Sequence, residues 1–134
     1  MKDGWSLDVV SAQPDATAVV LAENQFNKPP APGNQFYLVT VNVVRTGVES
    51  KSFDGSRLKA VGPGAVGYTT FNNGCGVYPG GGFNYGDSPE LFTGGSAQGN
   101  ICWQVASADA AGLVMYYDPL VSFSDSDRVY FAFH

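Results

Sequence analysis

The stretch QFYLVTVNVVR, residues 35–45, gives the clearest strand pattern in this chain of 134 residues. Every odd position from 37 to 43 is apolar, whereas Thr40 and Asn42 place polar groups on the opposite face. A period of two is typical of a strand that turns one face to a core and the other away from it. We therefore expect this segment to be a central strand of an antiparallel sheet.

Shorter segments with similar patterning lie on both sides of it, separated by turns rich in glycine and proline. They predict strands at residues 5–12, 16–22, 57–61, 67–71, 97–105, 113–117, 120–123 and 127–133. Residues 107–112 carry the serine start and glycine stop of one helical turn. About eight short strands with at most one short helical turn predict an all-β fold, an immunoglobulin-like antiparallel sandwich, in a single domain over residues 1–134.

The chain has two cysteines, Cys75 and Cys102, and no set of His and Cys residues at metal-binding spacing. Such a pair predicts one disulfide, and so an oxidising compartment outside the cytosol. Alternation along residues 97–105 turns Trp103 to the core and Cys102 to the polar face. The bond is thus expected to hold the glycine-rich segment 76–95 on the outside of one sheet. Two free buried thiols are the alternative.

Charge and hydropathy limit the partners of the chain. Twelve acidic residues against seven basic ones give a net charge of -5, which repels nucleic acid and anionic membrane surfaces. No segment approaches the ~20 apolar residues that span a bilayer, so no membrane insertion is expected from this segment itself. Because export still requires a signal, we expect Met1 to come from recombinant expression and a leader, lipid anchor or transmembrane segment to have been removed.

The residues that carry catalysis are sparse. His134 is the only histidine and the last residue, where a general base is rarely held in place, and zinc would lack ligands. Residues 62–67 match G-x-G-x-x-G as letters, but the following residues have strand character, which indicates a hairpin connection.

Four carboxylates lie near one another in the sequence: Asp109, Asp118, Asp125 and Asp127. A calcium site and a glycosidase pair of Asp109 with Asp118 are the functional alternatives, and solvated turn acids are the simpler explanation. We therefore predict no catalytic residue, no metal and no cofactor, and a protein that is not an enzyme.

Three aromatic residues, Tyr78, Phe83 and Tyr85, lie in the glycine-rich segment, where packing does not easily account for all of them. They are the candidate partner-binding residues. A carbohydrate-binding module that uses these rings is the alternative function. The structural explanation is that one or two of them cover the disulfide.

Several runs together resemble a family of bacterial immunoglobulin-like domains of unknown function. These are VVLAENQFN (19–27), GNQFYLVTVNV (33–43), GGS (94–96), GNICW (99–103) and DRVYFA (127–132). Such domains occur in exported lipoproteins and membrane-anchored proteins, and their sandwich is similar to that of a secreted mycobacterial immunoprotective antigen. The resemblance implies a β-sandwich at the bacterial cell surface without an established enzymatic activity or an agreed site.

The expected function is therefore a non-catalytic binding or spacer module, secreted or anchored at the bacterial cell surface. An unidentified protein or another component of the cell envelope would be its partner.

Overall fold

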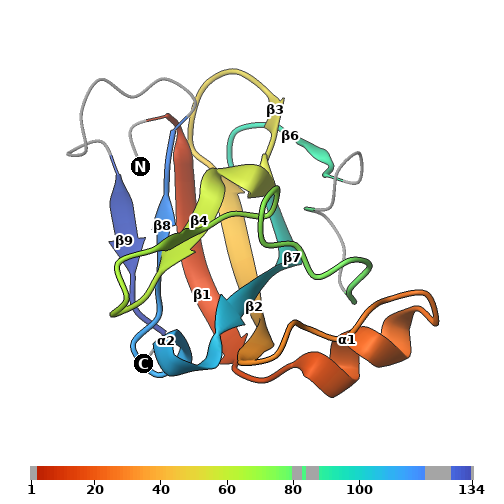
Figure 1. Ribbon diagram of the computed structural model, residues 1–134. Helices are drawn as coiled ribbons and strands as arrows, with labels where there is room; N and C mark the ends of the chain where they lie inside the picture. The colour runs from red at the N-terminus through yellow and green to blue at the C-terminus, as the bar shows by residue number, and fades with distance from the viewer. Residues whose placement is uncertain (1–2, 80–82, 84–87, 120–127, 134) are drawn as a thin grey trace.

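The computed structural model describes residues 3–79, 83, 88–119 and 128–133. The described strands form two antiparallel sheets and one short ribbon (Figure 1). One sheet has the strand order β1-β2-β7, the other has the order β5-β4-β8-β9, and the ribbon pairs β3 with β6. This arrangement confirms the all-β antiparallel sandwich expected from the sequence.

The strands are β1 (Trp5–Gln13), β2 (Asn34–Arg45), β3 (Lys51–Ser52), β4 (Leu58–Val61), β5 (Gly67–Tyr68), β6 (Glu90–Leu91), β7 (Ser96–Ala106), β8 (Val114–Tyr117) and β9 (Val129–Phe131). The helical elements are α1 (Thr17–Glu23), the 3-10 turn η1 (Gly55–Arg57) and α2 (Ser107–Ala110).

Strand β2 is the centre of the three-stranded sheet, as its alternation predicts. It pairs with β7 from Asn34 opposite Ala106 to Val44 opposite Ser96, and with β1 on its other side. Its odd residues face the main core, where Val39, Val41 and Val43 are fully buried. The four-stranded sheet and the loops beside it supply the rest of that core, including Phe53, Leu58, Ala60, Tyr68, Phe83, Leu113, Met115 and Tyr117.

A bulge between Val9 and Ser11 interrupts the alternation of β1. Before it, Trp5 and Leu7 face the core, and after it Ala12 packs there. The extra residue, Val10, is turned to solvent and is 54% exposed. One inserted residue shifts the phase of a strand, which explains why a single period does not fit the whole of β1.

The strand expected at residues 16–22 is wrong, because this segment forms helix α1. Ala16, at the helix start, and Val20 are both fully buried, and their spacing of four residues places them on one helical face. The amide of Ala16 donates to the carbonyl of Phe36, which holds α1 beside the start of β2 (Figure 1). Packing of this face outweighs the strand preference of the β-branched valines.

Other boundaries also differ from expectation. β5 ends at Tyr68 rather than at residue 71, and the short strands β3 and β6 have no clear period in the sequence. The helical turn expected from Ser107 is present as α2, but Ala106 is its cap and no side chain caps it. The expected strand at residues 120–123 lies outside the described residues.

Arg45 is the last residue of β2 and is only 3% exposed. Its Nε donates to the carbonyl of Glu49 at 2.8 Å, and its Nη1 lies 3.0 Å from the carbonyl oxygens of Asp3 and Gly4. The guanidinium also lies over the ring of Trp5, 4.9 Å from its centroid. One buried cation thus joins the segment before β1 to the loop after β2.

Asp109 of α2 fixes the turn between β4 and β5. It is 6% exposed, and its carboxylate accepts hydrogen bonds from the amide of Gly64 at 2.8 Å and from the hydroxyl of Tyr68 at 2.5 Å. A Cβ atom at Gly62 would lie 2.5 Å from the Cβ of Asp109, so a side chain there would collide with it. The first two glycines of the G-x-G-x-x-G string, Gly62 and Gly64, therefore make room for a carboxylate, in a hairpin connection as the sequence predicts.

This contact predicts a dependence of stability on pH. The hydrogen bonds from Tyr68 and Gly64 lower the pKa of Asp109, so the unfolded chain binds more protons at mildly acidic pH than the folded chain does. The stabilisation by Asp109 is present above the ordinary aspartate pKa of about 4 and is lost as pH falls through the lower pKa of the folded state. We expect Asp109→Asn to be less stable than wild type at pH 7, and the difference to shrink towards pH 3. Urea titrations across this range measure it, and a constant difference would contradict it.

Candidate functional site

The structure joins Cys75 and Cys102 in a disulfide whose Cα atoms are 5.9 Å apart. Cys102 faces away from the main core, opposite to Trp103, so the bond holds a loop against the outer side of the three-stranded sheet as expected. The face is not polar at this point, however. Cys102 is fully buried in a second apolar cluster with Ala16, Val20, Phe36, Leu38 and Cys75. The helix that the sequence did not reveal covers this end of the sheet.

Asn27 clamps the chain just after Cys75. Its side-chain amide donates to the carbonyl of Val20 at 2.8 Å and to the carbonyl of Val77, and its Oδ1 accepts from the amide of Val77 at 2.9 Å. Gly76, which lies between Cys75 and Val77, has φ +79°, and a Cβ atom there would lie 2.6 Å from Oδ1 of Asn27. A side chain at residue 76 would thus meet both backbone strain and a collision. The disulfide and Asn27 fix residues 75–77 from two directions.

Asn27→Ala removes this clamp and leaves the bridge intact. We expect a loss of about 1.5 kcal/mol in the free energy of unfolding, because three hydrogen bonds of a half-buried amide are lost. The amide of Val77 should also exchange faster with solvent. Hydrogen exchange followed by NMR measures both effects. Gln25→Ala, at a neighbouring exposed position, is the control and should change neither.

Two clefts lie on either side of the clamped segment, and both use Gly74, Cys75 and Gly76 as a wall. The first cleft has a volume of about 590 Å³. It is also lined by the η1 residues, including Arg57, and by Thr70, Phe71 and Tyr78. The second, of about 520 Å³, lies towards the proline-rich segment and includes Phe26, Lys28, Pro29, Phe36 and Gln104. We call the surface formed by these two clefts the disulfide surface.

Large apolar side chains are exposed on this surface. Phe26 is 82% exposed at the second cleft and Phe71 is 75% exposed at the first, while Val77 on the clamped segment is 51% exposed. Each cleft also carries a cation. Arg57 forms an ion pair with Asp54 at 3.4 Å, and Lys28 forms no ion pair within the described residues. Exposed aromatic rings beside cations are typical of binding surfaces for other molecules.

The three aromatic residues predicted as a binding site do not form one group in the described structure. Phe83 is 5% exposed and its ring centroid lies 5.1 Å from that of Phe53, so it belongs to the main core, and it also contributes to the lining of the first cleft. Tyr78 is half-buried against the disulfide cluster. Burial raises the pKa of its hydroxyl. Tyr85 lies outside the described residues.

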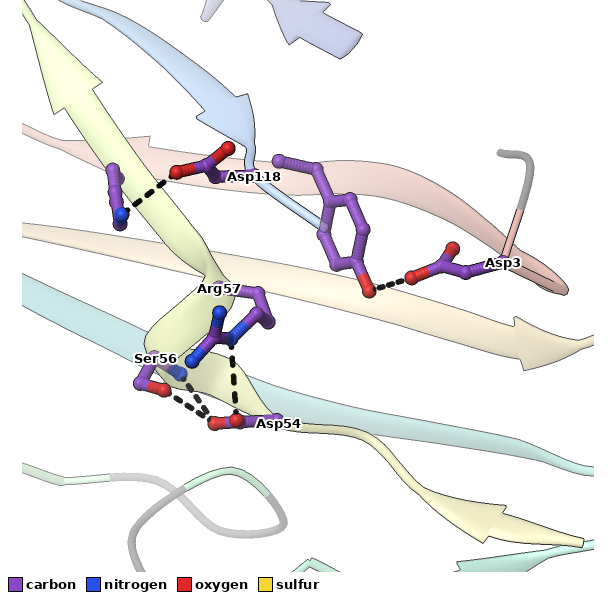
Figure 2. Close-up of polar contacts among 7 residues, drawn as sticks. Asp3, Asp54, Ser56, Arg57 and Asp118 are labelled. Atoms are coloured by element: carbon purple, nitrogen blue, oxygen red, sulfur yellow. Dashed lines mark hydrogen bonds and ion pairs between the residues drawn. The ribbon is translucent and has the colours of Figure 1, made fainter. Parts of the chain in front are cut away.

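A row of polar contacts lies at one end of the four-stranded sheet, where β4 begins and β8 ends (Figure 2). Asp54 caps η1 through the amide and hydroxyl of Ser56 and pairs with Arg57. The hydroxyl of Tyr117 donates to Asp3, and burial together with this hydrogen bond raises the pKa of Tyr117. The hydrogen bond between Tyr117 and Asp3 ties the first described residues to β8, and the contacts of Asp54 hold η1 together.

Asp109 and Asp118 do not form the carboxylate pair of a glycosidase, because they flank opposite ends of β8. Asp118 lies 2.8 Å from Lys59 and 3.5 Å from Arg128, and the hydrogen bond from Lys59 lowers its pKa. The pKa of Asp109 is lowered as well. Both are thus held ionised at neutral pH, the opposite of what a general acid requires.

Among residues 3–79, 83, 88–119 and 128–133, no group of three His, Cys, Asp or Glu side chains could hold a metal ion. His134, Asp125 and Asp127 lie outside these ranges. Within the same ranges, no helix has both the length and the apolar character needed to cross a membrane.

Phe26, Asn27 and Phe71 were not predicted as site residues. Phe71 falls in the strand expected at residues 67–71, and Phe26 and Asn27 lie between two expected strands. One signal was available, because Phe26 is a lone aromatic among Asn24, Gln25 and Asn27 without an apolar neighbour at strand spacing. The hydrogen bonds of Asn27 join residues 50 positions apart and leave no local trace.

The described fold belongs to the class of two-sheet antiparallel β-sandwiches. No family model and no curated protein matches the chain. Among solved structures, it is similar to the crystal structure of a "putative lipoprotein (ycdA)" from Bacillus subtilis subsp. subtilis str. 168, with a TM-score of 0.60 and 14% sequence identity. The match covers 96% of this chain and 36% of the Bacillus chain, so it spans about a third of that protein's length. At this identity the likeness shows a common fold.

Proposed function

We propose that this chain is a non-catalytic binding module of an extracytoplasmic bacterial protein, and that the disulfide surface is its binding site. The observation that carries the proposal is the exposure of Phe26 and Phe71 on two sides of a segment fixed by a disulfide and by Asn27. A fixed apolar surface binds with little loss of conformational entropy, because its ordering is already complete in the free protein.

The occupant we propose is a segment of a partner protein that carries apolar side chains and a carboxylate. The apolar groups match the two phenylalanine rings, and the carboxylate matches Lys28 or Arg57. Because the chain has a net charge of -5, these two cations are local positive charges on an otherwise acidic protein. Complementary charges of this kind speed association and select the partner more than they add affinity.

Two observations support a location outside the cytoplasm. The buried Cys75–Cys102 bridge is of the kind that persists in oxidising compartments. The solved structure with the same fold carries the description of a lipoprotein. We extend the proposal to membership of the immunoglobulin-like domains that the sequence resembles, anchored or secreted at the bacterial surface, in which the module binds a partner or spaces other domains.

A pair of variants tests the binding surface. The double variant Phe26→Ser/Phe71→Ser should bind a partner purified from envelope extract about tenfold or more weakly. Aromatic side chains that become buried in an interface dominate its binding energy. The melting temperature should stay close to that of wild type, since both rings are exposed. Phe92→Ser is the matched control, being a phenylalanine that is 66% exposed outside the two clefts. Equal affinity for the partner in all three proteins would refute the assignment.

Carbohydrate binding remains the alternative function, and a glycan array on the same variants separates it from protein binding. Stacking of sugars on loop aromatics needs open, flat rings. Of the three aromatic residues first predicted as the site, Phe83 is buried and Tyr78 is half-buried, so neither presents such a ring. The exposed rings of Phe26 and Phe71 do, so the glycan array decides between a sugar and a protein partner.

A further inference from the structure

Strand β1 lies at the edge of the three-stranded sheet, with β2 as its neighbour in the described structure. It has nine residues, which is long for an edge strand. The other edge of the sheet is different. There the amide of Gln104 on β7 donates to the carbonyl of Asn73, and the amide of Ala106 donates to the hydroxyl of Tyr68. Asn73 and the β5 residue Tyr68 thus occupy part of the β7 edge.

The pairing pattern shows which backbone groups of β1 face the open side. On β2, the amide and carbonyl of Arg45 bond to Gly95 and Gly94 on the β7 side, so odd residues of β2 point to β7. Even residues of β2 therefore point to β1, because backbone groups alternate in direction along a strand. Their partners on β1 are Ser6, Asp8, Ser11 and Gln13.

Leu7, Val9 and Ala12 occupy the alternate positions between these residues. Their amides and carbonyls therefore point away from β2. In the part of the chain that the structure describes, no hydrogen bond satisfies these groups. Their side chains pack on the main core, so the strand itself is firmly held. Rows of open donors and acceptors on a fixed strand are templates for the addition of another strand.

The outward face of β1 gives the chemistry of the strand that fits. Apart from Val10 in the bulge, its exposed side chains are polar, and Asp8 is its charged residue. A basic residue directly opposite Asp8 would form a favourable cross-strand pair. Pairing of two copies about Asp8 would instead oppose two carboxylates, in a chain whose net charge of -5 already repels its copies.

We propose that the open edge of β1 is a second interaction site, which accepts an extended polypeptide segment with a lysine or arginine opposite Asp8. The added strand pairs through its backbone with Leu7, Val9 and Ala12, and it extends the three-stranded sheet to four. The bulge between Val9 and Ser11 bends β1 and interrupts the ladder to the added strand between Val9 and Ala12.

The test uses two short, end-capped peptides with alternating Thr and Val, identical except for a central Lys or Glu. With the full chain labelled for NMR, millimolar Lys peptide should slow hydrogen exchange at the amides of Leu7, Val9 and Ala12 at least tenfold. The amides of Ser6 and Asp8, already bonded to β2, should change little. The Lys peptide should bind about fivefold more tightly than the Glu peptide, in line with the strength of cross-strand charge pairs. Asp8→Lys, at an exposed side chain, should reverse this preference.

Three results would overturn the proposal. The first is slow exchange at the amides of Leu7, Val9 and Ala12 without peptide, which would mean that the edge is already covered. The second is protection that rises with protein concentration alone, which would assign the edge to a second copy. The third is unchanged exchange at these amides with saturating peptide.

Discussion

Replacement of the bridge by Cys75→Ala with Cys102→Ala is expected to lower the free energy of unfolding by about 3.5 kcal/mol. The two cysteines are 27 residues apart, and the figure follows from the entropy that closing a loop of this length removes from the unfolded chain. Alanine is the appropriate replacement, because both positions are buried in an apolar cluster where a serine hydroxyl would lack a partner.

Urea unfolding of oxidised wild type, reduced wild type and the double variant measures this effect. Reduced wild type and the variant should be destabilised to a similar extent. Hydrogen exchange should accelerate around residues 75–77 more than in the β2–β7 pairing, since Asn27 alone then holds that segment. Equal stability of the oxidised and reduced protein would contradict the prediction. Detection of two free thiols in the native protein by mass spectrometry would also contradict it, and would remove a main support for export.

Arg45→Met is expected to cost about 3 kcal/mol, because it leaves the carbonyls of Asp3, Gly4 and Glu49 without their charged donor in a buried site. Methionine has a comparable length and keeps apolar contact with Trp5, so the loss reports mainly the hydrogen bonds and the cation over the ring. Urea unfolding gives the magnitude, and exchange at the amides of Thr46 and Gly47 gives the local effect, since both bond to Gly4.

Arg45→Lys is the informative comparison for this site. Lysine keeps the charge but lacks the planar fork that reaches carbonyls on two segments at once, so it should recover only part of the stability. Full recovery would mean that charge alone matters at this position. A loss below 1 kcal/mol for methionine, near the effect of a surface substitution, would contradict the role given to the buried guanidinium.

The strands with a clear period of two could be predicted from the sequence, and the helix could not. β2 and β7 appear at nearly the expected bounds because one of their faces is apolar throughout the core. Helix α1 carries a Val-Val-Leu run that favours a strand, and only the cluster formed by residues from four separate segments makes the helix more stable there. Information of that kind lies in the tertiary structure and not in any local window.

The candidate site shows the same limit. Spacing and composition were enough to pair Cys75 with Cys102 and to turn Cys102 away from Trp103. They could not separate Phe83, which completes the core beside Phe53, from aromatic rings that stay in solvent. They also could not identify Phe26 and Phe71, because exposure depends on which surfaces the rest of the chain covers.

The packing of Asp109 against Gly62 and Gly64 restricts which residues can occupy these three positions in homologous proteins. A methyl group at Gly62 collides with Asp109 and one at Gly64 crowds its carboxylate, while loss of the carboxylate leaves the amide of Gly64 without its acceptor. Substitutions at these three positions are therefore coupled, and viable homologues should alter them together or not at all. An alignment of close orthologues would show them co-varying as one unit.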